Sequence, residues 1–331
     1  MGKIISFDYI RTISIILIIL AHCCFGMNGM YFLGQFFANT FNIIFLALSA
    51  FLLGLSWQKH NCPEYKISFI TKRLRKLSNS YYTFIVIMFI FLAYTGYNNT
   101  IKDWLMHIFF LPWFDKLPGF GHLWFITMIV ICYIGIFVVS RLPCKLLTNV
   151  KRGGIILLLV SIVTQMIIGR MGLPNYILVY LLLYIYAFLN AERILNFIDR
   201  IPLKSSMISG TVIIIAAILL FYFNLLNEYT SKWCGIISAL AVFTIFVKLF
   251  KNSAKNAIVE YISTISFELY LVHHVFCFGK YSLYQIIPNP ILGTIAIFTI
   301  SIILAALLHY ISNSIKNTIT NIGQKNSVPA K

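Results

Sequence analysis

Long apolar stretches alternate with short polar segments along the whole of this 331-residue chain. A bilayer core about 30 Å thick is crossed by roughly 20 apolar residues in a helix, and about ten stretches approach that length. The predicted spans are residues 4–26, 31–55, 78–96, 122–141, 153–169, 174–190, 207–226, 232–250, 257–279 and 290–312. We therefore predict an all-α integral membrane protein, a polytopic bundle of about ten transmembrane helices.

Composition and charge support this prediction. The chain is 60% hydrophobic and only 11% charged, whereas soluble domains are near a quarter charged. Its net charge of +17 comes from short segments between the spans, with twenty Lys or Arg residues on one predicted side and five on the other. This bias predicts that both termini are cytoplasmic, in a multi-pass protein of the inner (plasma) membrane. The lipid bilayer, and no nucleic acid, is then the partner of the basic residues.

Arg11 and His22 stand out in the first predicted span. Eleven residues at 100° each come to about 20° more than three full turns, so the two side chains share a helix face about 16 Å apart. Alone, Arg11 is explained equally well by snorkelling to the headgroups with Asp8 beside it. For His22 alone, a hydrogen bond within the bundle is the better explanation. Together they favour a polar cavity that crosses most of the membrane.

Two further motifs lie at the edges of spans. Arg73 and Arg75, in the cytoplasmic loop entering the third span, serve either as positive-inside charge or as a site for a phosphate-rich ligand. His122 and Trp124 open the fourth span, where Trp124 fits an aromatic belt or a sugar-stacking platform. The outer segment before them, residues 97–121, predicts a packed loop with a partial interfacial helix. The seven cysteines lack metal-ligand spacing, and we expect no metal.

The ninth predicted span concentrates polar residues in one helix. It carries Glu260, Ser266, Glu268, Tyr270, His273 and His274. On an unbroken helix Ser266 aligns with His273, and Tyr270 aligns with His274. No role follows for Glu268 or His274, and His309 in the last span is interpreted as isolated and structural.

These motifs together resemble the acyltransferase-3 family of integral-membrane acyltransferases. The matching features are a basic residue, ten positions and a histidine (Arg11, His22), R-x-R (Arg73, Arg75), "HLWF", and the late "SFELYLVH". The resemblance implies a transmembrane acyltransferase domain over residues 1–315, without a fused esterase-like domain. The last residues, "GQKNSVPAK", indicate a disordered cytoplasmic tail, which we place over residues 316–331.

The resemblance also implies a mechanism. An acyl group, most simply acetyl, passes from cytoplasmic acyl-CoA to a hydroxyl of an envelope polysaccharide or lipid-linked saccharide. Arg11, Arg73 and Arg75 would bind the acetyl-CoA, and His22 would be the general base, with Tyr270 or His273 orienting it or stabilising the intermediate. The substrate-binding residues would be His122, Trp124 and Ser266.

Two other classes of function remain open. A polar path through ten helices also fits a transporter of an acylated or charged molecule, which Gly- or Pro-interrupted helices at the midplane would favour; no convincing interruption is found. Alternatively, the protein is a structural partner in a polysaccharide-assembly complex, in which case loss of His22 would leave the pathway intact. The sequence names neither the acceptor nor the acyl group.

Overall fold

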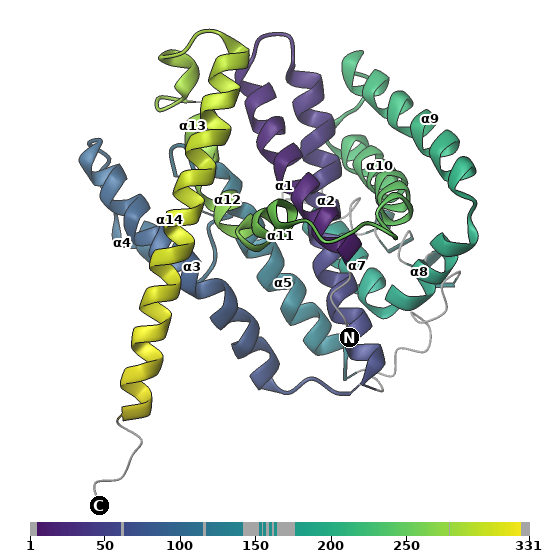
Figure 1. The fold of residues 1–331 in the computed structure, drawn as a ribbon, viewed down its shortest axis with the longest axis horizontal. Coiled ribbons are helices and arrows are strands. Elements are labelled where there is room, and N and C mark those ends of the chain that lie inside the picture. Colours follow the sequence, from purple (N-terminus) through teal and green to yellow (C-terminus); the bar gives the residue numbers. More distant parts are fainter. Residues whose placement is uncertain are drawn as a thin grey trace, which may run out of the picture. The chain divides into compact units, whose positions relative to one another are not determined.

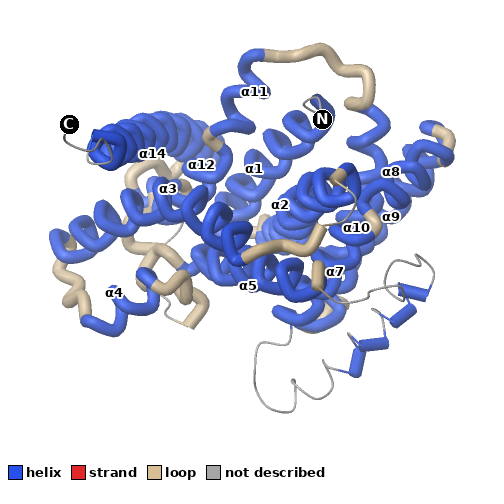
Figure 2. Tube along the Cα trace, turned by 90° about the horizontal axis from the view of Figure 1, so that it is seen from below, coloured by secondary structure: helices blue, strands red, loops and turns tan. Residues whose placement is uncertain are grey.

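The computed structural model describes residues 5–60, 63–114, 117–141, 152–153, 155–156, 159–160, 162–163, 176–277 and 279–325. This part of the chain is built from helices and loops, with no strand in it (Figure 2). The all-α prediction is therefore confirmed. Ten of the seventeen residues of the fifth predicted span, 153–169, lie outside the described residues.

Seven described helices are long and apolar enough to cross a membrane. They are α1 (Ile5–Gly26), α2 (Tyr31–Lys59), α3 (Ile67–Tyr94), α5 (Trp124–Val139) with the short η1 (Gly121–Leu123) before it, α9 (Leu203–Tyr222), α10 (Glu228–Leu249) and α14 (Pro290–Lys325). An eighth span results if α7 (Tyr176–Leu189) and α8 (Ala191–Arg200), bent by 77° at their junction, are taken together. The polytopic character is confirmed, and the count of ten stays a prediction.

The shorter elements are α4 (Ile101–Ile108), α11 (Ala257–Thr264), α12 (Ser266–Val272), α13 (His274–Cys277) and η2 (Leu283–Gln285). Helix α4 begins where it does because Thr100 and Asp103 form a capping box, in which each side chain accepts a hydrogen bond from the other's backbone N–H. The predicted partial helix between the third and fourth spans is confirmed.

The chain divides into two compact units, which we describe separately. The first comprises Met1–Ile70 and Met128–Ser263. Within it α2 packs against α1, α7, α9 and α10 (Figure 1). Glycines allow this close packing, because a Cβ at Gly54 would clash with the Phe188 carbonyl and one at Gly235 would lie 2.7 Å from the Asn39 carbonyl oxygen.

The second unit comprises Thr71–Thr127 and Thr264–Lys331. In this unit α12 packs against α14. The next element, α13, contacts α12 and η2, and η2 also contacts α14. Its interior holds large side chains that are almost fully buried, among them Tyr81, Phe89, Leu123 and Leu269. The unit therefore has a core of its own around residues 266–273, the segment with the sequence "SFELYLVH".

The predicted ninth span is not one helix, which corrects the sequence interpretation. The segment breaks at Ile265 and at His273 into α11, α12 and α13, although residues 257–277, which form these helices, contain neither Gly nor Pro. Polar side chains beside each break bond to other elements: Ser263 donates to Asp8, and Nδ1 of His274 donates to the Gly119 carbonyl. Each break is therefore flanked by a hydrogen bond to another part of the chain.

Two helices extend further than predicted. Helix α3 begins at Ile67, so Arg73 and Arg75 are helical rather than in a loop, because the segment is rich in Lys, Arg and Leu and has no helix breaker. Helix α14 continues past Ser312 to Lys325. The remaining residues of the predicted tail, 326–331, lie outside the described residues, and the tail stays a prediction.

Candidate functional site

Arg11 lies half-buried on α1, within the first unit. Its Nη1 donates to Oγ of Ser263 at 3.3 Å, and that hydroxyl donates to Oδ1 of Asp8 at 2.8 Å. Ser263 thus joins the cation to the acid that the sequence placed beside it. Among the described residues Ser263 is the only hydrogen-bond partner of the guanidinium. Most of its five N–H donors are therefore available to a ligand.

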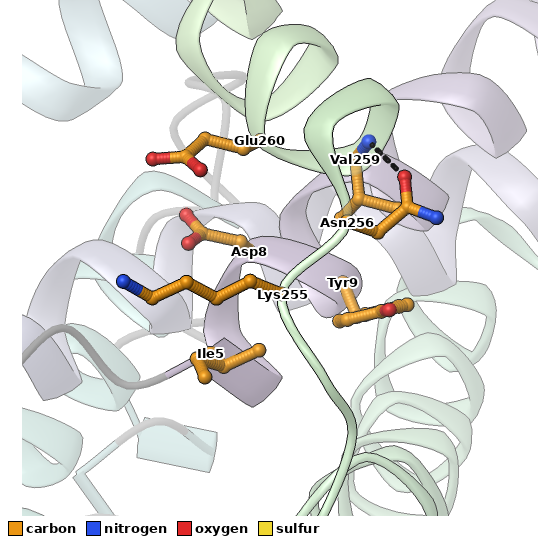
Figure 3. A pocket seen from close by; sticks show the side chains of 7 residues that line it. All are labelled: Ile5, Asp8, Tyr9, Lys255, Asn256, Val259 and Glu260. Atoms are coloured by element: carbon orange, nitrogen blue, oxygen red, sulfur yellow. Dashed lines mark hydrogen bonds between the residues drawn. The ribbon is translucent and has the colours of Figure 1, made fainter.

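The start of α1 is fastened to the segment that leads into α11. The Tyr9 hydroxyl donates to the Ala254 carbonyl at 3.0 Å, and the Thr12 hydroxyl donates to the Val259 carbonyl at 2.9 Å. A small pocket opens between these two segments; its lining residues are Ile5, Asp8, Tyr9, Lys255, Asn256, Val259 and Glu260 (Figure 3). The charged ends of Asp8, Glu260 and Lys255 gather on one side of it (Figure 3). Arg11, three residues after Asp8, is thus close to a pocket that already holds charges of both signs.

His22 lies near the other end of the same helix. Because α1 is continuous from Ile5 to Gly26, the predicted shared face of Arg11 and His22 follows from its geometry. The His22 ring is half-buried and meets the Phe25 ring edge-on at a centroid distance of 5.9 Å. A basic residue, about two turns from the start of α1, and a histidine near its end therefore lie on one membrane-length helix.

The second unit contains a buried histidine cluster made of His122, Tyr270, His273 and His274. Each of these four side chains is at most 4% exposed. The His122 ring stacks on that of His274 with centroids 4.4 Å apart, and it lies 5.1 Å from the Tyr270 ring and 5.2 Å from the His273 ring. Three of the residues singled out from sequence, His122, Tyr270 and His273, are thus brought together.

Backbone carbonyls determine the tautomer of each histidine in this cluster. Nδ1 of His273 donates to the carbonyls of Leu269 and Tyr270, and Nδ1 of His274 donates to that of Gly119 at 2.7 Å. His122 instead donates from Nε2 to the Leu271 carbonyl at 3.2 Å. A carbonyl oxygen can only accept, so each bonded nitrogen carries the proton, and the other nitrogen of a neutral ring is a base.

Tyr270 ties the cluster to the start of the fourth predicted span, because its hydroxyl donates to the His122 carbonyl. Trp124 follows two residues later, half-buried, with its ring edge-on to Trp113 at 5.3 Å. Ser266 is buried in the first turn of α12, four residues before Tyr270. The predicted alignment of Ser266 with His273 assumed an unbroken helix, which the break at His273 corrects.

Sequence reasoning missed a second polar network in this unit. Oε1 of Glu268 accepts hydrogen bonds from Ser80 at 2.7 Å and from Nδ1 of His309 at 3.0 Å. Asn313 then donates to Nε2 of His309 at 2.9 Å. The interpretation of His309 as isolated is therefore wrong. A buried acid in an apolar helix was the signal that a distant partner existed.

Arg73 and Arg75 both lie on the part of α3 that belongs to the second unit. Residues two apart on a helix are about 200° apart around its axis, so the two guanidinium groups leave α3 on different sides. Arg75 is exposed and Arg73 half-buried. In the described part of the chain no group of three or more His, Cys, Asp or Glu residues is arranged to hold a metal ion.

Comparison with known families decides the relationship. A family model described as an acyltransferase domain, that of the acyltransferase-3 family, matches residues 4–310. The chain belongs to the acyltransferase-3 family. Searches of curated proteins and of solved structures gave no significant match. As an acyltransferase-3 protein with several membrane-length helices, it is a multi-pass membrane acyltransferase.

Proposed function

We propose that this acyltransferase moves an acyl group, most simply acetyl, from cytoplasmic acyl-CoA to a hydroxyl of an envelope polysaccharide or lipid-linked saccharide. Membership of the acyltransferase-3 family supports the transfer of an acyl group. The observation that carries the choice of donor is Arg11, a half-buried cation with one hydrogen-bond partner among the described residues. A charge in a span costs about 2.5–3.5 kcal/mol on insertion scales, and an anionic ligand offsets that cost.

The negative charge of acyl-CoA complements the basic residues that we assign to its binding. Its phosphates suit guanidinium groups, which bind phosphate through two parallel hydrogen bonds. We assign Arg11, Arg73 and Arg75 to these phosphates. The extended pantetheine arm would then follow the face of α1 that Arg11 shares with His22, over about 16 Å.

His22 is the general base in this proposal. It accepts the proton of the acceptor hydroxyl as the oxygen attacks the thioester carbonyl. The C–O bond forms, the C–S bond breaks, and the proton passes from His22 to the sulfur, which leaves as free CoA. An imidazole, with a reference pKa of about 6.5, suits both halves of this transfer near neutral pH.

The histidine cluster serves the acceptor side in this proposal. The Tyr270 hydroxyl donates a hydrogen bond to the His122 backbone carbonyl, so Tyr270 positions His122. We assign His122, Trp124 and Ser266 to binding the acceptor. Neutral His273 has its proton on Nδ1, and its Nε2 is a hydrogen-bond acceptor. We therefore assign His273 to orienting a hydroxyl rather than to stabilising an oxyanion.

Release of CoA from acetyl-CoA by the purified protein in nanodiscs tests this function. We expect wild-type protein to release CoA slowly even with water as acceptor, and His22→Ala to lose at least about 100-fold in kcat, as for removal of a general base. The Arg73→Ala/Arg75→Ala variant should instead raise KM for acetyl-CoA. Lys102→Ala, an exposed change on α4, is the matched control and should behave as wild type.

Tight acetyl-CoA binding by wild-type protein with no effect of His22→Ala, on CoA release or on glycan acylation in cells, would rule out His22 as the base. Absence of acetyl-CoA binding by wild-type protein would rule out the donor. Either result leaves the membership of the family intact, because that rests on the sequence match.

One observation favours transport as a second candidate function. The segment from α11 to α13 is a broken helix, a feature of secondary transporters, although no Gly or Pro causes the breaks. A transporter would move a labelled acyl donor or acetylated saccharide into proteoliposomes that hold no acceptor, at a rate unaffected by His22→Ala. The acyltransferase reaction predicts release of CoA without such movement.

A further inference from the structure

Helix α8 is a short amphipathic helix that turns away from the direction of α7. The two helices meet at 77°, and α8 connects α7 to the start of α9 in the first unit (Figure 1). Ala191 and Ile198 on one side of α8 are buried against the protein. If α7 crosses the bilayer, α8 runs close to the membrane plane, at the end that the charge bias predicts to be cytoplasmic.

The opposite side of α8 carries an Arg–Phe–Arg stripe, defined as Arg193, Phe197 and Arg200. At 100° per residue, Phe197 lies about 40° to one side of Arg193 and Arg200 about 20° to the other, so the three share one narrow face. The Phe197 side chain is 64% exposed. Among the described residues neither guanidinium has a hydrogen-bond or ion-pair partner.

The acids of α8 lie elsewhere and do not neutralise the stripe. Glu192 and Asp199 are about 100–120° from Arg193 around the helix axis. Asp199 forms an ion pair with Lys251 at 2.9 Å, and Lys248 donates to the Asp199 backbone carbonyl at 3.4 Å. These contacts fasten the acidic flank of α8 to the end of α10, and the two arginines are left facing outward.

We propose that the Arg–Phe–Arg stripe binds the headgroup of an anionic phospholipid of the membrane leaflet at this end of the protein. Two uncompensated guanidinium groups complement a phosphodiester and its additional negative charge. A largely exposed phenyl ring between them is unfavourable in water and favourable at the headgroup boundary, where aromatic rings of membrane proteins concentrate. The site is independent of the acyl-transfer reaction.

Lipid binding to the purified full-length protein in detergent tests the proposal, with phosphatidylglycerol and phosphatidylcholine titrated separately and bound lipid counted by native mass spectrometry. Arg193→Gln/Arg200→Gln should weaken phosphatidylglycerol binding roughly 10- to 30-fold, because a basic residue near an anionic surface contributes about 1 kcal/mol. Phosphatidylcholine binding should be weak and unchanged. Lys66→Gln/Lys72→Gln is the charge-matched control, since both lysines are exposed and have no partner among the described residues.

The control distinguishes a specific site from general attraction. Equal losses of phosphatidylglycerol binding in both double variants, or no loss in Arg193→Gln/Arg200→Gln, would overturn the proposal. So would displacement of phosphatidylglycerol by free CoA at comparable concentration, because the stripe would then belong to a nucleotide-phosphate site. Both double variants change exposed side chains only, so we expect both proteins to fold as wild type does.

The position of the ring gives a second, independent measurement. In Phe197→Trp, the fluorescence added over wild type should be quenched by lipids with a nitroxide near the headgroup and protected from iodide in the water. Strong quenching by iodide with no quenching by the lipid nitroxide would place the stripe in the aqueous phase and overturn the proposal.

Discussion

Individual buried polar residues show how position determines what a side chain can do. Arg11 and Glu268 are both ionisable and both lie on helices of an apolar protein, yet Glu268 has two hydrogen-bond donors and Arg11 has one acceptor. A carboxylate supplied with two donors is a structural contact. We propose a ligand-binding role for a guanidinium with most of its donors unused, and the roles proposed here follow that difference.

His107, on α4 outside the membrane-length helices, leads to a prediction about pH. Its ring is 1% exposed, with Nδ1 3.1 Å from the Tyr81 hydroxyl oxygen. Burial lowers its pKa from 6.5 to about 4, although nearby Asp103 favours the charged form. Between pH 6.5 and 4 the unfolded state therefore binds more protons than the folded state, and the free energy of unfolding should decrease as the pH falls, by up to about 3 kcal/mol.

Thermal unfolding in detergent across that pH range measures the effect. His107→Asn, which keeps a polar atom near the position of Nδ1, should have a shallower loss of stability than wild type between pH 6.5 and 4. His60→Asn, an exposed change at the end of α2, should leave the wild-type slope. Parallel curves for wild type and His107→Asn would show that the burial of His107 does not affect stability in this way.

At the scale of elements, helix α12 is the feature that organises the second unit. Helix α12 has seven residues, too few for a stable isolated helix, so contacts on its sides must hold it. Glu268 bonds to α3 and α14, while Tyr270, about 200° further round α12, bonds to the backbone of η1. The two contacts hold α12 from opposite sides and so position the histidines that follow.

The Glu268–His309 contact should therefore stabilise the folded protein as a pair. We expect Glu268→Ala and His309→Ala each to lower the free energy of unfolding by about 1–3 kcal/mol, since each leaves a polar group without its partner. The double variant should lose less than the sum, with a coupling of about 0.5–3 kcal/mol. Denaturation in detergent gives the values, and the exposed Glu192→Ala should be neutral. Strictly additive losses would mean that the pair makes no energetic contribution.

At the scale of the whole molecule, the arrangement across the membrane follows from charge. Seven or eight membrane-length helices are seen in the described residues, and more than half of the fifth predicted span lies outside them. The parity of the total matters, because an even number of spans places both termini on the same side. The bias of basic residues predicts that this side is the cytoplasm.

Reporter fusions check this topology. Green fluorescent protein fused to either terminus should fluoresce, and alkaline phosphatase fused there should be inactive, because the first folds in the cytoplasm and the second only outside it. Truncated fusions after Lys59 and after Gly96 provide matched inner and outer controls. An active phosphatase at one terminus only would require an odd number of spans.

The amino-acid sequence by itself determined the class of fold, the bounds of most long helices and the family. Hydropathy and charge bias are sums over one contiguous segment, and motif spacing is read along the chain, so neither needs knowledge of the fold. The first-span pair illustrates this, because Arg11 and His22 share a face on any unbroken helix, and α1 is unbroken.

Only the tertiary structure decided the contacts between residues far apart in the chain. Stacking of His122 on His274, the bond from His274 to Gly119, and the pairing of Glu268 with His309 join residues separated by 152, 155 and 41 positions. The breaks that separate α11, α12 and α13 are likewise not marked in the local sequence, because residues 257–277 contain no Gly or Pro. A hydrogen bond depends on which groups meet in space, and periodicity along one helix carries no information about its partner in another.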